Sequence, residues 1–347
     1  MEGHGCASAD PPAPYCVNTT ARAAYVFSAT GACLLQLPPL LAALSSLHAT
    51  RPAFPSLVML APDCWAPLRA ALSAARALPL LVPRLSASSC AGAFSRPAHF
   101  NTTFTILRVF ALAPLEAALL LDSDLSVRRP LDHLLRLMLD NPRLFQLRTP
   151  QQCRMLRGAD DFSPSRRRYA EEMWNTGVWA VRPDARVHAQ LAAFLAAGNF
   201  SCGVGVQSAA TAMFNSAGYS PPPLRLAAGR APVVLHLHAG YNLKADVGGA
   251  RCLAWRGLAP SDVHVVHWSG TRKPWLLRHA AQIGRMDAVE RPAALAYMRD
   301  YCAALVTHVP PPWHAAPCVH ALREYQRQAS SHAGSPAIQL LMGQLGA

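Results

Sequence analysis

Leu-Leu-Leu-Asp-Ser-Asp-Leu-Ser-Val, residues 119–127, is the stretch from which the rest of the chain is best interpreted. Its aliphatic run is typical of a strand buried on both faces, and it stops abruptly at two carboxylates, Asp122 and Asp124. Open α/β sheets bind their ligands at the carboxyl ends of strands, so we expect both acids at such an edge. Hard oxygen ligands on either side of Ser123 suit Mg²⁺ or Mn²⁺, ions that usually serve substrate phosphates.

Strand and helix patterns alternate on both sides of this stretch. Apolar runs predict further strands at 25–28, 56–60, 80–82, 144–147, 174–181 and 263–267. Helical spacing between most of these runs favours an α/β fold with a mostly parallel central sheet flanked by helices. We expect a flexible tail at 1–22, one large α/β domain at 23–276 and a helical C-terminal extension at 277–347.

Residues 23–47 contain no charged side chain, and two interpretations of this segment stay open. A membrane anchor is one of them, because an apolar run of this length can span a bilayer. We favour strand, loop and helix, at 25–28, 29–33 and 38–48, with Pro38 and Pro39 starting the helix. Association of the chain with a membrane is therefore an open question at this point.

Composition excludes some classes of protein. The chain is 52% hydrophobic and 15% charged, which is too apolar for a disordered protein. Its net charge of +13 is compatible with nucleic acid, a membrane surface or a phosphorylated substrate. The one dense basic run, 166–168, lacks the interleaved aromatic residues of single-strand binders, so we expect no nucleic-acid partner.

The chain has ten cysteines, an even number, and no C-x-x-C pair of the kind typical of zinc sites, so we expect no zinc site. Glycosylation sequons occur at Asn18, Asn101 and Asn199. Together they favour a secretory lumen such as the Golgi over the cytoplasm, although the first twenty residues have no apolar core typical of a signal peptide. Neither the disulfide pairing nor the oligomeric state follows from the sequence.

Three later motifs accompany the acidic pair: M-W-N-T-G-V-W-A-V at 173–181, G-V-G-V-Q at 203–207 and V-V-H-W-S-G-T-R-K-P-W at 265–275. In this order and spacing they resemble glycosyltransferase family 8, the glycogenin-like retaining enzymes with a GT-A fold. The resemblance covers roughly residues 23–276. It implies a GT-A domain and a hexosyltransferase that moves a sugar from a UDP-sugar to a glycan, lipid or protein acceptor, with retention of configuration.

The resemblance also implies a metal and phosphate site. Asp122 and Asp124 match the metal-binding D-x-D motif, and His267 matches the third metal ligand. Two carboxylates and one imidazole suit Mn²⁺ better than Mg²⁺, and the ion would stabilise the leaving UDP as a Lewis acid. Lys273 and the backbone at Gly270 match the group that binds the diphosphate, a role for which a lysine provides a compact charge.

Five more residues match contacts to the nucleotide-sugar. Ser28 and Thr30, at the end of the first strand, match the contacts to uracil and ribose. Ser123, between the two acids, and Asn175 match contacts to the donor. Gln207 matches the catalytic glutamine on the sugar face opposite the leaving group, where it would stabilise a cationic sugar.

Each of these residues also has a purely structural interpretation when taken alone. His267 has the pattern of an ordinary buried strand histidine, and Asn175 that of a turn or cap residue. A single lysine is most often a solvated surface residue. Lys273 is nevertheless one of only two lysines in the chain, and it stands inside the last motif.

The chain departs from the family pattern at three places. Val206 stands where an Asp usually precedes the glutamine, and Ile106 stands where a Lys usually reaches the nucleotide-sugar. Arg108 lies two residues on and would point elsewhere on a helix, so we do not count it as a replacement. Cys33 and Leu34 stand where an aromatic residue usually follows the first strand. A GT-A pseudo-enzyme that binds nucleotide or a partner is therefore the alternative, and a membrane-bound luminal processing factor is a third hypothesis.

Overall fold

The computed structural model describes residues 20–87, 98–112, 114–150, 174–198, 200, 205–214, 233–245, 253–254, 256–269, 273–275, 286, 290–309, 318–319 and 321–323. The chain divides into two compact units that interleave along the sequence. The first comprises Met1–Cys33, Ala53–Leu121 and Leu131–Leu237, and the second comprises Leu34–Pro52, Asp122–Pro130 and His238–Ala347. The predicted tail at 1–22 falls almost wholly outside the described residues, and so does the boundary at 276; both stay predictions.

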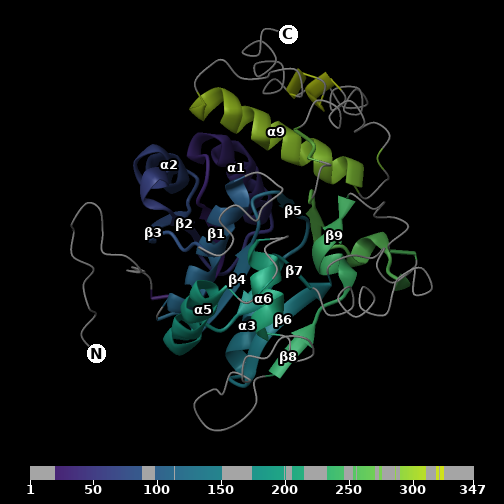
Figure 1. Cartoon of the computed structure of the whole chain (residues 1–347). Helices are drawn as coiled ribbons and strands as arrows, with labels where there is room; N and C mark the ends of the chain where they lie inside the picture. The colour runs from purple at the N-terminus through teal and green to yellow at the C-terminus, as the bar shows by residue number, and fades with distance from the viewer. Residues whose placement is uncertain are drawn as a thin grey trace. The chain divides into compact units, whose positions relative to one another are not determined.

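The first unit is built on a seven-stranded sheet in the order β3-β2-β1-β4-β7-β6-β8 (Figure 1). The strands are β1 (Ala23–Ala29), β2 (Ser56–Leu60), β3 (Leu78–Leu81), β4 (Ala117–Leu121), β6 (Leu144–Pro150), β7 (Trp174–Val181) and β8 (Val233–His236). Neighbouring strands pair in parallel everywhere except at β7, which is antiparallel to both β4 and β6. The prediction of a mostly parallel sheet is confirmed.

Strand β4 lies at the centre of this sheet. It pairs with β1 on one side and β7 on the other, and all five of its side chains are buried. Burial on both faces is what its unbroken aliphatic run predicted. The described helical segments of the unit are α2 (Pro62–Ala74), η2 (Ala98–Ala111), α3 (Asp132–Asp140), α5 (Ala185–Ala197) and α6 (Val206–Phe214).

The second unit has a smaller sheet of three strands in the order β5-β10-β9. They are β5 (Leu125–Val127), β10 (Val265–His267) and β9 (Leu243–Lys244), and β10 is antiparallel to β5 and parallel to β9. Two long helices, α1 (Cys33–Ala49) and α9 (Glu290–His308), accompany this sheet, together with the short turns η4 (Ala239–Asn242) and η6 (Pro260–Asp262).

The uncharged segment at 23–47 forms a strand followed by a helix, as we favoured. Within the described residues, no helix is both long and apolar enough to cross a lipid bilayer. The predicted helix start was wrong, because α1 begins at Cys33 and contains Pro38 and Pro39. Proline lacks the N–H that would bond four residues back. The carbonyls four residues back belong to Leu34 and Leu35, which are both exposed residues.

Two disulfides connect described cysteines. Cys33, the first residue of α1, is bonded to Cys64 in α2, and Cys302 in α9 is bonded to Cys318. The first of these ties the start of α1 to a neighbouring helix, which helps to explain why the helix begins ahead of its prolines. Among the described cysteines none is free.

Candidate active site

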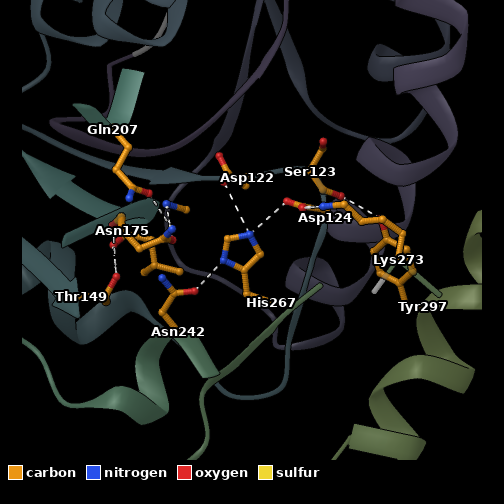
Figure 2. Close-up of polar contacts among 12 residues, drawn as sticks. Asp122, Ser123, Asp124, Thr149, Asn175, Gln207, Asn242, His267, Lys273 and Tyr297 are labelled. Atoms are coloured by element: carbon orange, nitrogen blue, oxygen red, sulfur yellow. Dashed lines mark hydrogen bonds and ion pairs between the residues drawn. The ribbon is translucent and has the colours of Figure 1, made fainter. Parts of the chain in front are cut away.

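The acidic pair and His267 come together in the second unit through the pairing of β5 with β10. In this register His267 lies opposite Leu125, the residue that directly follows the acidic pair. The backbone N–H of Trp268 also donates to the Asp124 carbonyl oxygen at 2.8 Å. Two segments far apart in the sequence therefore end at the same point, with the acids on one and the imidazole on the other (Figure 2).

The three side chains form a close group. Nε2 of His267 lies 3.2 Å from Oδ1 of Asp124 and 3.6 Å from Oδ2 of Asp122. One ligand atom from each residue lies within 4.8 Å of the other two. The imidazole is 2% exposed, whereas both carboxylates are more open. This is an arrangement that could hold a metal ion.

Asn242 orients the imidazole from the other side. Its Oδ1 lies 2.8 Å from Nδ1 of His267, and the side chain is buried at the end of η4. A carbonyl oxygen only accepts, so Nδ1 donates to it, and Nε2 is the ring nitrogen that faces the two carboxylates and would bind a metal. This is the tautomer that a metal ligand needs. Sequence patterns assigned Asn242 no role.

Lys273 is the cation beside the acids. Its ammonium forms an ion pair with Oδ2 of Asp124 and lies 5.6 Å from the centre of the Trp275 ring. Burial lowers the pKa of Lys273 to about 8, against the attraction of Asp122, so the group remains mostly protonated at neutral pH. Two carboxylates against one ammonium leave an excess of negative charge, which a divalent cation would balance.

The chemistry of this group therefore fits a divalent metal. Two carboxylates and one imidazole with its tautomer set by Asn242 make a mixed O/N ligand set, of the kind that Mn²⁺ accepts. Lys273, which is paired with Asp124, adds a positive charge beside the same group.

The first unit holds a second group of predicted residues, Asn175 and Gln207. Asn175 lies near the start of β7 and Gln207 in the first turn of α6, and both side chains are buried. Oδ1 of Asn175 accepts from the Gly177 N–H at 2.9 Å, and its Nδ2 donates to Oε1 of Gln207 at 3.0 Å. Thr149 on β6 braces this strand, with its hydroxyl 3.1 Å from the Val178 carbonyl oxygen (Figure 2).

These contacts determine which end of the Gln207 amide is available. A backbone N–H only donates, so the Asn175 atom facing Gly177 is its oxygen, and the Gln207 atom facing the Asn175 amide must also be oxygen. Nε2 of Gln207 is buried and has no hydrogen-bond partner among the described residues. An unpaired buried donor costs free energy, so the amide group is poised to donate to a ligand. The amide nitrogen of Gln207 is thus the end that is open to a ligand, and its predicted role beside a cationic sugar stays a prediction.

Val206 and Ile106, the two departures from the family pattern, belong to the hydrophobic core. Both are buried in the cluster that α6, η2 and β4 share, where Val206 is 8% exposed and Ile106 is 5% exposed. Their side chains therefore contribute to the packing of the first unit. Arg108 points to the carbonyl oxygens of Pro83 and Arg84, at 3.1 and 3.3 Å, as expected for a residue that does not replace the missing lysine.

Four predicted residues remain, namely Ser28, Thr30, Ser123 and Gly270. Ser28 stands on β1 opposite Met59, and Thr30 directly follows that strand and is buried. Ser123 stands between the two acids, and its carbonyl oxygen accepts from Tyr297. Gly270 lies outside the described residues, so its predicted phosphate contact stays a prediction.

Comparisons with known proteins identify the fold. No family profile matches the sequence, and no curated protein matches it. The structure of the galactosyltransferase LgtC with donor and acceptor sugar analogues aligns with a TM-score of 0.52 and 16% identity, over 85% of this chain and 99% of LgtC. A glutamine-to-glutamate active-site mutant of LgtC gives 0.51 and 16% over the same shares.

The bifunctional glycosyltransferase WbbM, without ligand, has a TM-score of 0.50 at 14% identity. That alignment covers 84% of this chain and 51% of WbbM, so the chain spans about half the length of that protein. At identities this low the likeness establishes the fold alone. The chain has the GT-A fold of these glycosyltransferases.

Proposed function

We propose that the protein is a Mn²⁺-dependent glycosyltransferase that moves a hexosyl group from a UDP-sugar to a glycan, lipid or protein acceptor with retention of configuration. The proposal includes membership of glycosyltransferase family 8. The observation that carries it is the convergence of Asp122, Asp124 and His267, with Nε2 of the imidazole facing both carboxylates. Solved GT-A neighbours that bind donor and acceptor sugar analogues support the same reaction class.

In this proposal the second unit binds the diphosphate. The bound ion supplies Lewis-acid stabilisation of the leaving UDP. Asn242 keeps the proton of His267 on Nδ1, and Lys273 moves its charge from Asp124 toward the phosphate oxygens. A charged donor close to the leaving group stabilises the negative charge that develops there during transfer.

Asn175 and Gln207 are proposed to act on the sugar. Gln207 donates through Nε2 to a sugar oxygen, and Asn175 holds the Gln207 amide in that orientation. LgtC also has a glutamine in its active site, the residue changed in its glutamate mutant, which supports the choice of Gln207 as its counterpart. Ser28, Thr30 and Ser123 are proposed to contact the nucleotide, and the acceptor is proposed to attack from the side of the leaving group.

The first experiment is calorimetric titration of UDP in Mn²⁺ and in EDTA, with parent protein and Asp124→Asn. We expect Mn²⁺-dependent binding in the parent and its loss in the variant, with unchanged circular dichroism, because Asp124 is a metal ligand and not a core residue. UDP binding that EDTA does not affect would refute the metal assignment. A panel of UDP-sugars with Mn²⁺ or Mg²⁺ then tests turnover, and NMR of the product identifies its anomeric configuration.

The alternative proposal is a pseudo-enzyme that binds nucleotide without turnover. Val206 and Ile106, the departures that suggest it, pack in the core of the first unit. The alternative predicts Mn²⁺-dependent UDP binding without turnover of any donor, which the same panel detects. The secretory compartment is part of the proposal, and the two disulfides support it because such bonds persist in oxidising surroundings.

A further inference from the structure

Helix α9 of the C-terminal extension contacts the turn that carries the two acids. Tyr297, in the middle of this helix, is 1% exposed. Its hydroxyl oxygen lies 2.8 Å from the carbonyl oxygen of Ser123 and 3.1 Å from that of Pro39 in α1. A phenol has a single proton, so the shorter contact to Ser123 is the better donated bond. Ser123 is the residue between Asp122 and Asp124 (Figure 2).

The next carbonyl along the turn is held as well. Asp124 accepts from the backbone N–H of Trp268, the residue after the metal-site histidine, at 2.8 Å. With two successive carbonyls bonded, the peptide planes on both sides of the Asp124 α-carbon have fixed orientations. The direction of the Asp124 side chain from the backbone is then fixed too. One of these two bonds comes from the adjacent strand and the other from the distant helix.

The same helix supports the lysine of the site. The ring of Tyr297 stacks on Trp275, with centroids 5.5 Å apart and an interplanar angle of 24°. Tyr301, one turn later in α9, stacks on Trp275 at the same centroid distance with an angle of 12°. The Trp275 ring in turn faces the ammonium of Lys273. Aromatic stacking of this kind restricts the position of the indole, and hence of the lysine beside it.

We propose that Tyr297 is a positioning residue that holds the turn between Asp122 and Asp124 in its metal-binding conformation through the Ser123 carbonyl. This makes the C-terminal helix part of the active-site support. The inference rests on the proposed function, which supplies the metal, but the contact itself does not depend on it. The hydroxyl of Tyr297 is the decisive group, since its ring alone would still stack on Trp275.

The test compares Tyr297→Phe with two matched controls in the full chain. Tyr301→Phe also removes a phenol hydroxyl from a ring that stacks on Trp275. Ser45→Ala removes a different bond between α1 and α9, in which the serine hydroxyl donates to Asp300 at 2.5 Å. Hydrogen exchange by mass spectrometry follows the peptide that contains residues 122–125, and electron paramagnetic resonance measures bound Mn²⁺ with UDP present. Thermal unfolding is recorded for every variant.

We expect faster exchange in the turn and roughly tenfold weaker Mn²⁺ affinity for Tyr297→Phe alone, the loss typical of removing a group that supports a metal ligand. Parent-like exchange in Tyr297→Phe would overturn the inference. Equally fast exchange of this peptide in either control would also overturn it, because it would indicate general loosening of α9. Unfolding of Tyr297→Phe alone would overturn the inference as well. A parent that binds no Mn²⁺ would refute the metal of the proposed function, while the exchange data would still decide the role of Tyr297.

Discussion

Replacing Gln207 by glutamate tests whether the amide group of this residue donates to the sugar. The two side chains have nearly the same shape, and Oε1 of the glutamate can still accept from Asn175. When the glutamate is ionised, the substitution replaces the Nε2 donors, which are buried and have no partner among the described residues, by an oxygen that only accepts. A donor of this kind is satisfied when a ligand binds, so its loss should cost binding free energy.

The expected magnitude follows from that unpaired donor. Satisfying one buried polar group is worth roughly 1–3 kcal/mol, which corresponds to about a 5- to 150-fold loss of UDP-sugar affinity. UDP without a sugar should bind Gln207→Glu as it binds the parent, because the proposed partner of Nε2 is on the sugar. Titrating both ligands with Mn²⁺ present therefore separates this contact from the phosphate site.

Asn175→Asp is the matched variant. An aspartate still accepts from the Gly177 N–H but cannot donate to Gln207, so the Gln207 amide should turn and donate to the new carboxylate. Its oxygen would then face the ligand, and we expect a loss of UDP-sugar affinity like that of Gln207→Glu. Unchanged affinity and turnover in both variants would refute the donor role and favour the oxygen of Gln207 as the group that faces the sugar.

The pH dependence of Gln207→Glu gives an independent check. Burial disfavours the charged carboxylate, so the folded-state pKa of the introduced glutamate should lie above its unfolded value. A raised folded pKa means that the destabilisation is smallest at low pH and grows as the pH rises through that pKa. The difference in Tm between parent and variant should therefore be larger at pH 8 than at pH 5. An equal difference at both values would show that position 207 is accessible to water.

Three further substitutions test the remaining parts of the site. Lys273→Ala should weaken the binding of UDP by roughly 1.5–3 kcal/mol and the binding of uridine hardly at all, because only UDP has phosphates to contact. Equal weakening of both in titrations would indicate a folding defect. Asn242→Leu should release the orientation of His267 and lower the Mn²⁺ affinity by about 10- to 100-fold, measured by electron paramagnetic resonance, without changing the fold. A parent-like affinity would contradict the orienting role of Asn242. Val206→Asp should lower stability by roughly 3 kcal/mol or more in denaturant unfolding, because it places an unpaired charge in the core; an unchanged midpoint with a gain of turnover would restore the pseudo-enzyme hypothesis.

Local patterns predicted most strands and helices of this chain, but not every boundary or direction. The apolar run of β7 is the same pattern in either direction, so the sequence did not indicate that this strand is antiparallel to β4 and β6. Proline at Pro38 normally marks a helix start, yet α1 begins at Cys33. Cys33, at that start, is bonded to Cys64, and a local pattern does not record such a pairing.

The candidate site shows the same division. Sequence motifs pointed to Asp122, Asp124 and His267, and the structure brings all three together. Asn242 and Tyr297 were assigned no role, because each acts through one hydrogen bond to a residue distant in the chain. Such a bond leaves no periodicity or spacing in the sequence.

What the sequence determined by itself was the α/β class, the buried central strand and the residue types of a metal and phosphate site. These features follow from the local hydrophobic pattern and from the ligand chemistry of the side chains, and both can be read from short stretches of sequence. Only the tertiary structure decided that Val206 belongs to the core and that the Gln207 amide is the group left to donate. Both depend on which atoms of distant segments meet, and those meetings are set by packing and hydrogen-bond direction in three dimensions.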